Sequence, residues 1–153
     1  MSLGKKFYRQ DAVTVAEELV GKLLIRKING QEIKCRIVET EAYMGAEDKA
    51  SHAYQNKRTP RTEVMFKSGG YVYVYLIYGM YYCFNVVTGV EDKPGAVLIR
   101  SVEPLSGIDI IKKNRKIKSD KKQDLTNGPG KLCQALQINE NFDRYNLSKA
   151  DDL

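Results

Sequence analysis

A short acidic segment carries the side chains best suited to acid–base chemistry. Residues 39–43 read Glu-Thr-Glu-Ala-Tyr, and the two-residue period of a β-strand would place Glu39, Glu41 and Tyr43 on one face. A carboxylate held at a cleft wall beside aromatic rings is the minimal equipment for activating a water molecule. The same three residues would also suit a face that is exposed to solvent. The sequence alone therefore does not distinguish a cleft from an exposed surface here.

The other reactive residue types disfavour several classes of site. His52 is the single histidine of the chain, so a site that needs two imidazoles is excluded. The sequence contains neither a Gly-x-Gly-x-x-Gly pattern nor a Walker loop. Cys35, Cys83 and Cys133 include no Cys-x-x-Cys pair, which predicts reduced thiols and no metal site. A nucleotide-cofactor or zinc enzyme is therefore disfavoured.

A tyrosine-rich segment is the most unusual part of the chain. Residues 71–87 read YVYVYLIYGMYYCFNVV and contain six of the ten tyrosines. The alternation predicts a β-hairpin that reverses at Gly79, with Tyr71, Tyr73 and Tyr75 on one face. The other face carries Val72, Val74 and Leu76.

The predicted tip of this hairpin is crowded with large side chains, namely Ile77, Tyr78, Met80 and Tyr81. Hairpin turns usually carry small or polar residues. Either the tip packs on another element, or one of its side chains acts as a wedge that enters a base stack, as in proteins that bind the minor groove.

The remaining elements form the frame that would position these side chains. Asn29-Gly30 favours a two-residue turn, which predicts a hairpin of strands 23–28 and 32–43. Asp11 is placed to cap a short amphipathic helix that Gly21 ends. Further predicted elements are a polar loop at 45–57, a break at 59–60, a strand at 96–102, and helices at 105–114 and 131–138.

Length and charge indicate one soluble domain with a basic surface. The chain has 153 residues, of which 42% are hydrophobic, and a formal net charge of +6. No apolar run reaches the roughly 18 residues needed to span a bilayer, and no signal peptide is evident, so an unexported protein is expected. The positive charge predicts affinity for nucleic acid, anionic membranes or acidic substrates.

One stretch concentrates this charge. Seven basic residues lie between Lys112 and Lys122, against Asp120 alone. Such a run is either a solvated loop or a surface that faces phosphates. Together with the crowded hairpin tip, the positive charge points to DNA.

Six segments, in their order and spacing, resemble the alkyladenine (3-methyladenine) DNA glycosylase family, also called methylpurine DNA glycosylases. They are RIVETEAYMG, SHAYQNKRTPR, MF, YVYVYLIYGMYYCFNVV, AVLIRSVEP and NGPGKLCQALQI. The resemblance runs from about Gly4 to the C-terminus. It implies a mixed α/β (α+β) fold, in which residues 1–153 form one compact domain around a curved antiparallel sheet, with a protruding β-hairpin for the DNA minor groove.

The resemblance also implies an activity. Members of this family are monofunctional enzymes of base excision repair, which flip alkylated or deaminated purines out of duplex DNA and hydrolyse the N-glycosidic bond. They use no metal or organic cofactor. We therefore expect double-stranded DNA with damaged purines as the partner, no membrane association, and a monomer. The expected compartment is the bacterial cytoplasm at the nucleoid, or the nucleus in a eukaryote.

Roles for individual residues follow from the same resemblance. Glu41 matches the general base, and Arg100 matches a basic residue near the catalytic water and the phosphate of the flipped nucleotide. The matched pocket residues are Tyr43, His52, Tyr75 and Asn85. Tyr78 matches the intercalating side chain, and the further expected DNA contacts are Met80, Tyr81 and Thr59.

Two other functions are compatible with part of the sequence. A non-catalytic binder of distorted DNA would use the basic surface and the wedge, but a carboxylate at the base position argues against it. A bifunctional glycosylase/lyase needs an amine nucleophile, and no lysine lies at the matched pocket positions. Members of the family usually continue for several tens of residues past Leu153, so we expect a C-terminal segment of the family to be missing here.

Overall fold

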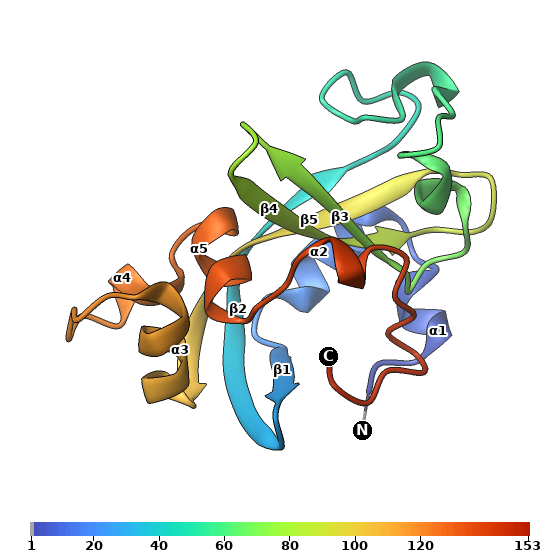
Figure 1. The fold of residues 1–153 in the computed structure, drawn as a ribbon. Coiled ribbons are helices and arrows are strands. Elements are labelled where there is room, and N and C mark those ends of the chain that lie inside the picture. Colours follow the sequence, from blue (N-terminus) through green and yellow to red (C-terminus); the bar gives the residue numbers. More distant parts are fainter. Residues whose placement is uncertain (1) are drawn as a thin grey trace.

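Five antiparallel strands in the order β1-β2-β5-β4-β3 form the frame of the structure (Figure 1), a computed structural model that describes residues 2–153. The strands are β1 (Leu23–Ile28), β2 (Gln31–Tyr43), β3 (Val72–Ile77), β4 (Tyr81–Thr88) and β5 (Gly95–Ser106). Figure 1 shows the sheet strongly twisted, with the tip of the β3–β4 hairpin standing clear of the other elements. The predicted mixed α+β fold around an antiparallel sheet is confirmed.

Short helices surround the sheet. They are α1 (Lys5–Tyr8), α2 (Ala12–Leu19), α3 (Ile108–Arg115), α4 (Gln123–Thr126) and α5 (Pro129–Ala135), with 3-10 turns η1 (Tyr54–Asn56), η2 (Glu63–Phe66) and η3 (Glu140–Phe142). As predicted, Asp11 caps α2, where its Oδ1 accepts the Thr14 backbone N–H at 3.0 Å. Within residues 2–153, every helix lacks the length and apolar character needed to cross a membrane.

The two faces of the sheet are covered differently. One face packs against α2 and α5 and forms the main core, with side chains such as Val72, Phe84 and Ile99 fully buried. The other face has a smaller cover, made by the segment between β2 and β3, whose Val64, Met65 and Phe66 pack on Tyr73, Val87 and Ala96. This second face holds the candidate site, where the rings of Tyr73 and Tyr75 lie beside His52 and the buried Asn85.

Both predicted hairpins are present. Asn29 and Gly30 have φ of 50° and 77° between β1 and β2, and Tyr78 and Gly79 have φ of 54° and 64° at the tip of the β3–β4 hairpin. Positive φ at consecutive positions is the backbone conformation that favours glycine in tight turns. The backbone conformation of these residues therefore determines where the chain turns in both hairpins.

Several element boundaries differ from the predictions. The strand predicted at 96–102 continues to Ser106, and α3 begins at Ile108 instead of 105, because the first half of β2 also pairs with β5. Helix α5 begins at Pro129, before the predicted 131, since proline suits the first position of a helix. The basic run starts inside α3, so it is only partly a loop.

Candidate active site

A row of residues across four strands brings distant parts of the chain together on the second face. Glu41 on β2 lies opposite Leu98 on β5, Leu98 lies opposite Asn85 on β4, and Asn85 lies opposite Tyr73 on β3. Directly opposed residues in antiparallel strands project from the same face. The register therefore places an acidic residue, an amide and a tyrosine side by side although up to 44 positions separate them, from 41 to 85.

The acidic end of this row is an ion-paired cluster. Arg100 donates from Nη1 to Glu41 Oε2 at 2.8 Å and from Nε to Glu39 Oε1 at 2.9 Å. Arg100 can reach both carboxylates because it lies at a β-bulge: Glu39 pairs with Ser101 and Thr40 with Ile99, which leaves Arg100 as the extra residue. The hydrogen bond to Glu39, followed by that to Glu41, raises the pKa of Arg100 above its ordinary value.

Tyr43 joins this cluster to a cavity. Its hydroxyl donates to Glu41 Oε1 at 3.0 Å. Burial, and next the hydrogen bond to Glu41, raise the pKa of Tyr43 to about 12, so the hydroxyl keeps its proton at neutral pH. Tyr43 also lines a cavity between the sheet and the segment that covers it. The carboxylate and the cavity are therefore separated by a single side chain.

The cavity has aromatic walls and one amide. Its lining residues are Tyr43, Ala50, Ser51, His52, Met65, Tyr73, Tyr75, Asn85 and Ala96. The rings of His52 and Tyr75 meet edge to face with centroids 4.6 Å apart, and those of Tyr73 and Tyr75 are 5.3 Å apart. Burial raises the pKa of Tyr73 and Tyr75, so both are neutral phenols. Uncharged aromatic faces are suited to stacking on a planar ring.

Asn85 is the buried polar residue of this cavity. It is 2% exposed, and its Nδ2 donates to the backbone carbonyl of Tyr73 at 3.1 Å. A carbonyl oxygen only accepts, so this bond fixes the orientation of the amide. Among the described residues, Oδ1 has no hydrogen-bond donor, so it is available to accept from a ligand.

Comparison with known proteins places these features in a family. A family model described as methylpurine-DNA glycosylase (MPG) matches residues 6–153, nearly the whole chain. The chain belongs to the methylpurine-DNA glycosylase family. The members of this family are hydrolases that act on N-glycosidic bonds of DNA, which confirms the resemblance and the class of enzyme expected from the sequence.

Individual relatives of this methylpurine-DNA glycosylase family member come from bacteria. A protein of Natranaerobius thermophilus is 59% identical over 153 residues, covering 100% of this chain and 77% of its own length. One from Desulfitobacterium hafniense is 53% identical over 95% of this chain and 74% of its own length. One from Borrelia garinii subsp. bavariensis is 52% identical over 99% of this chain and 76% of its own length. All three names assign the proteins provisionally as 3-methyladenine DNA glycosylases.

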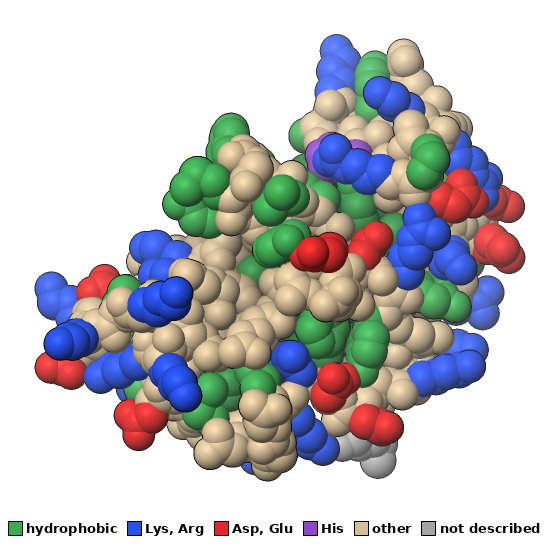
Figure 2. Space-filling view, viewed as in Figure 1, with side chains coloured by type: hydrophobic (Ala, Val, Ile, Leu, Met, Phe, Trp, Pro, Cys, Tyr) green, Lys and Arg blue, Asp and Glu red, His purple; other side chains and the backbone are tan. Residues whose placement is uncertain are grey.

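The hairpin tip of this family member is largely exposed, although Tyr81 contacts α5. Tyr78 is 86% exposed and Met80 is 69% exposed, whereas Tyr81 is half exposed and its ring lies against the backbone of Gly130 at the start of α5. Figure 2 shows these hydrophobic side chains on one side of a hollow, with the lobe that carries the single histidine on the other side. The tip and the cavity therefore lie on the same side of the molecule.

The structure brings the predicted catalytic and pocket residues together, whereas the predicted DNA contacts lie outside the cavity: Tyr78, Met80 and Tyr81 at the hairpin tip, and Thr59 in an outer groove that His52 also lines. The Thr59 hydroxyl and backbone N–H both bond Thr62 Oγ1, at 3.2 and 2.8 Å, within a turn. Two residues to which the sequence analysis gave no site role contact His52: Tyr73, whose hydroxyl lies 2.8 Å from Nδ1, and Arg61. The alternation of tyrosines put Tyr73 on the correct face, but Arg61 follows no periodic pattern that would reveal it.

Proposed function

We propose that this chain is a monofunctional DNA glycosylase that flips alkylated or deaminated purines out of duplex DNA and hydrolyses their N-glycosidic bond. The observation that carries this proposal is the link from the Glu41 carboxylate through Tyr43 to an aromatic cavity. Membership of the family supports the reaction class, and the geometry supports the roles of individual residues.

Glu41 would act as the general base. Each carboxylate oxygen offers two lone pairs. Tyr43 donates to one oxygen of Glu41 and Arg100 donates to the other, so one lone pair on each oxygen is used. A lone pair therefore remains for a water molecule, and the side chain is 43% exposed, so water can reach it. A negative charge here would also stabilise the cationic sugar that forms as the glycosidic bond breaks. Arg100 would hold the carboxylate in place.

The cavity would bind the flipped base. Tyr43, His52 and Tyr75 supply its aromatic walls. Stacking of a base on an aromatic ring is worth about 1 to 3 kcal/mol, which can offset the few kcal/mol needed to unstack and unpair a nucleotide. Alkylated purines carry positive charge, so aromatic faces attract them beyond ordinary stacking. Asn85 Oδ1 would accept a hydrogen bond from the purine edge.

Tyr78 would fill the gap left by the flipped nucleotide. Its high exposure at the end of a hairpin supports a wedge that enters the minor groove. Met80 and Tyr81 would contact the DNA next to it, and Thr59 would contact DNA from the opposite side of the hollow. The partner is duplex DNA, and we expect a monomer in the bacterial cytoplasm, in line with the bacterial relatives.

No lysine is among the residues of the described chain that line this cavity, which supports hydrolysis by water over a Schiff-base mechanism.

A gel assay separates the candidate functions. Duplexes containing hypoxanthine or 3-methyladenine are incubated with the protein, with and without alkali. Strand cleavage only after alkali is the expected result. Cleavage without alkali would indicate a lyase, and binding without any cleavage would indicate a non-catalytic DNA-binding protein.

A further inference from the structure

Building on the proposed function, we propose that Arg61 is a positioning residue of the base cavity. Through its hydrogen bonds to Tyr73 and His52, Arg61 holds the His52 ring as the tautomer that carries its proton on Nε2. His52 is thereby a hydrogen-bond donor for the bound base. None of the roles derived above includes Arg61.

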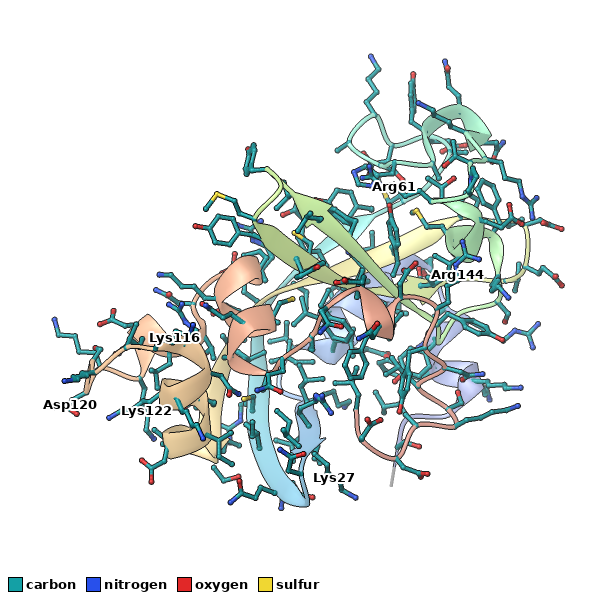
Figure 3. All side chains as sticks on the ribbon, viewed as in Figure 1. Lys27, Arg61, Lys116, Asp120, Lys122 and Arg144 are labelled. Carbon is teal, nitrogen blue, oxygen red and sulfur yellow. The ribbon has the colours of Figure 1, made fainter. Side chains whose placement is uncertain are left out.

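Three short contacts connect these side chains. Arg61 Nε lies 3.0 Å from the Tyr73 hydroxyl, the Tyr73 hydroxyl lies 2.8 Å from His52 Nδ1, and Arg61 Nη2 lies 2.9 Å from the same Nδ1. Figure 3 labels Arg61 between the β3–β4 hairpin and the lobe formed by the segment between β2 and β3. The Tyr73 hydroxyl and the Arg61 guanidinium thus converge on one ring nitrogen of His52.

The lengths and directions of these contacts favour one tautomer. A guanidinium has donors only, so the Tyr73 oxygen accepts from Arg61 and can donate its own hydrogen to His52 Nδ1. Arg61 Nη2 can also only donate, and it lies closer to Nδ1 than to Nε2, at 2.9 Å against 3.2 Å, which favours Nδ1 as the acceptor. A ring nitrogen that accepts carries no proton, so with Nδ1 as the acceptor the proton of neutral His52 lies on Nε2. The 3.2 Å approach of Arg61 Nη2 to Nε2 is then a contact between two donors and not a hydrogen bond.

The surroundings of His52 favour its neutral form. Three tyrosines line the cavity with His52: Tyr73 and Tyr75 on β3, and Tyr43 at the end of β2. The titratable side chains that line the outer groove beside His52 are Lys49, Tyr54, Lys57 and Arg61. In the part of the chain that the structure describes, neither the cavity nor this groove is lined by Asp or Glu. Burial, and next the charge of Arg61, lower the pKa of His52 below 6.5.

Arg61 is itself held in place by its loop. Thr62 Oγ1 donates to the Lys57 carbonyl at 2.9 Å, and Arg144 Nη2 donates to the Pro60 carbonyl at 2.6 Å. The guanidinium of Arg61 also lies over the Tyr75 ring, 5.3 Å from its centroid. Bonds on both sides of residue 61 reduce the freedom of the loop, so the guanidinium is directed at the cavity before any ligand binds.

The single histidine makes this proposal directly measurable. The 15N and 1H resonances of one imidazole give its tautomer and its titration midpoint without assignment ambiguity. The proposal predicts an Nε2–H tautomer and a midpoint below 6.5 in the wild-type protein. Arg61→Gln should raise the midpoint toward 6.5, and Tyr73→Phe should leave a mixture of tautomers. Lys57→Gln removes an equal charge from the same loop and should leave the tautomer unchanged.

An identical tautomer and midpoint in wild type and Arg61→Gln would overturn the proposal, and so would an equal shift in Lys57→Gln. Thermal melting of each variant shows whether it is folded. This measurement needs no DNA, so its result is independent of whether the chain excises any base.

The excision reaction gives a second readout. Single-turnover rates on a hypoxanthine duplex are measured from pH 5.5 to 8.5 and normalised for each protein to its rate at the highest pH. Arg61→Gln should lose activity at a higher pH than wild type, with a deficit on the order of 10-fold at the acidic end. His52 becomes charged earlier in this variant, and a protonated Nδ1 no longer accepts from Tyr73, so the ring loses its fixed orientation. Normalised profiles that superimpose would contradict the role of Arg61, whereas absence of excision by the wild type would contradict the proposed function instead.

Discussion

Glu41 and Tyr43 form the residue-level connection between base activation and base binding. The hydroxyl of Tyr43 donates to Glu41 Oε1, and the ring of Tyr43 lines the cavity. One side chain therefore both orients the carboxylate and forms part of the cavity wall. Replacing the tyrosine by phenylalanine removes the hydrogen bond and keeps the ring, which makes the two roles separable.

Tyr43→Phe should slow excision by about 5- to 10-fold, the rate equivalent of one hydrogen bond of about 1 kcal/mol or slightly more. Affinity for DNA with an abasic site should stay the same, because the hydroxyl that the substitution removes donates to Glu41. Single-turnover kinetics and a binding titration measure the two effects. A rate equal to that of wild type would show that Tyr43 does not orient Glu41.

His52 also makes stability depend on pH. Its pKa in the folded protein is lowered, so between pH 6.5 and that lower value the unfolded chain takes up a proton that the folded chain does not. The free energy of unfolding should therefore fall as the pH is lowered through this window. Urea unfolding at several pH values, with His52→Gln as the reference, measures the difference between the two proteins. A constant difference across pH 5 to 7 would contradict the lowered pKa.

At the level of elements, turns were predictable and some boundaries were not. Asn29-Gly30 and Gly79 marked both hairpin turns, since few residues tolerate their backbone conformation. The end of β5 was missed because Leu105 is the extra residue of a β-bulge: Lys34 pairs with Ser106 and Cys35 with Pro104. A bulge interrupts the two-residue period, and only the partner strand decides where pairing continues.

The hairpin gives the element-level prediction. Tyr78→Ala empties the wedge, so flipping should become less favourable by about 1 to 3 kcal/mol and excision from paired substrates should slow. A base in a mismatch or loop is easier to flip, so the loss should be smaller there. Single-turnover rates on matched and looped duplexes test this. Equal losses on both would indicate that Tyr78 has only a structural role.

At the scale of the whole molecule, the candidate site depends on contacts that no local pattern encodes. The sequence placed Glu39, Glu41 and Tyr43 on one face, and the family resemblance supplied His52 and Asn85 as pocket residues. The bulge that directs Arg100 to both carboxylates arises from the pairing of β2 with β5. The contact of Arg61 with His52 arises from the fold of a loop without regular structure.

Two groups of lysines could supply the phosphate contacts. Lys49 and Lys57 line the groove beside the cavity, whereas Lys116, which is labelled in Figure 3, and Lys118 follow α3. Part of the basic run is used internally, since Lys112 pairs with Asp120. The lysines next to the cavity are therefore the better candidates for phosphate contacts near the flipped nucleotide.

Salt dependence of DNA binding distinguishes the two groups. The logarithm of affinity falls with the logarithm of salt by about 0.9 for each phosphate neutralised. The double variant Lys49→Gln/Lys57→Gln should reduce this slope by about 1.8, and Lys116→Asn/Lys118→Gln should leave it unchanged. Asparagine is chosen at 116 because φ there is 55°. The opposite pattern would move the phosphate-binding surface to the region after α3.

Glu41→Gln tests the central claim most directly, with Glu39→Gln as the matched control. Both carboxylates bond Arg100, but only Glu41 bonds Tyr43 beside the cavity. Single-turnover excision of hypoxanthine from duplex DNA should fall by on the order of 100-fold or more in Glu41→Gln, while binding to abasic-site DNA is retained. Glu39→Gln should lose far less. Excision by Glu41→Gln at the wild-type rate, or an equal loss in both variants, would contradict the assignment of Glu41 as the base.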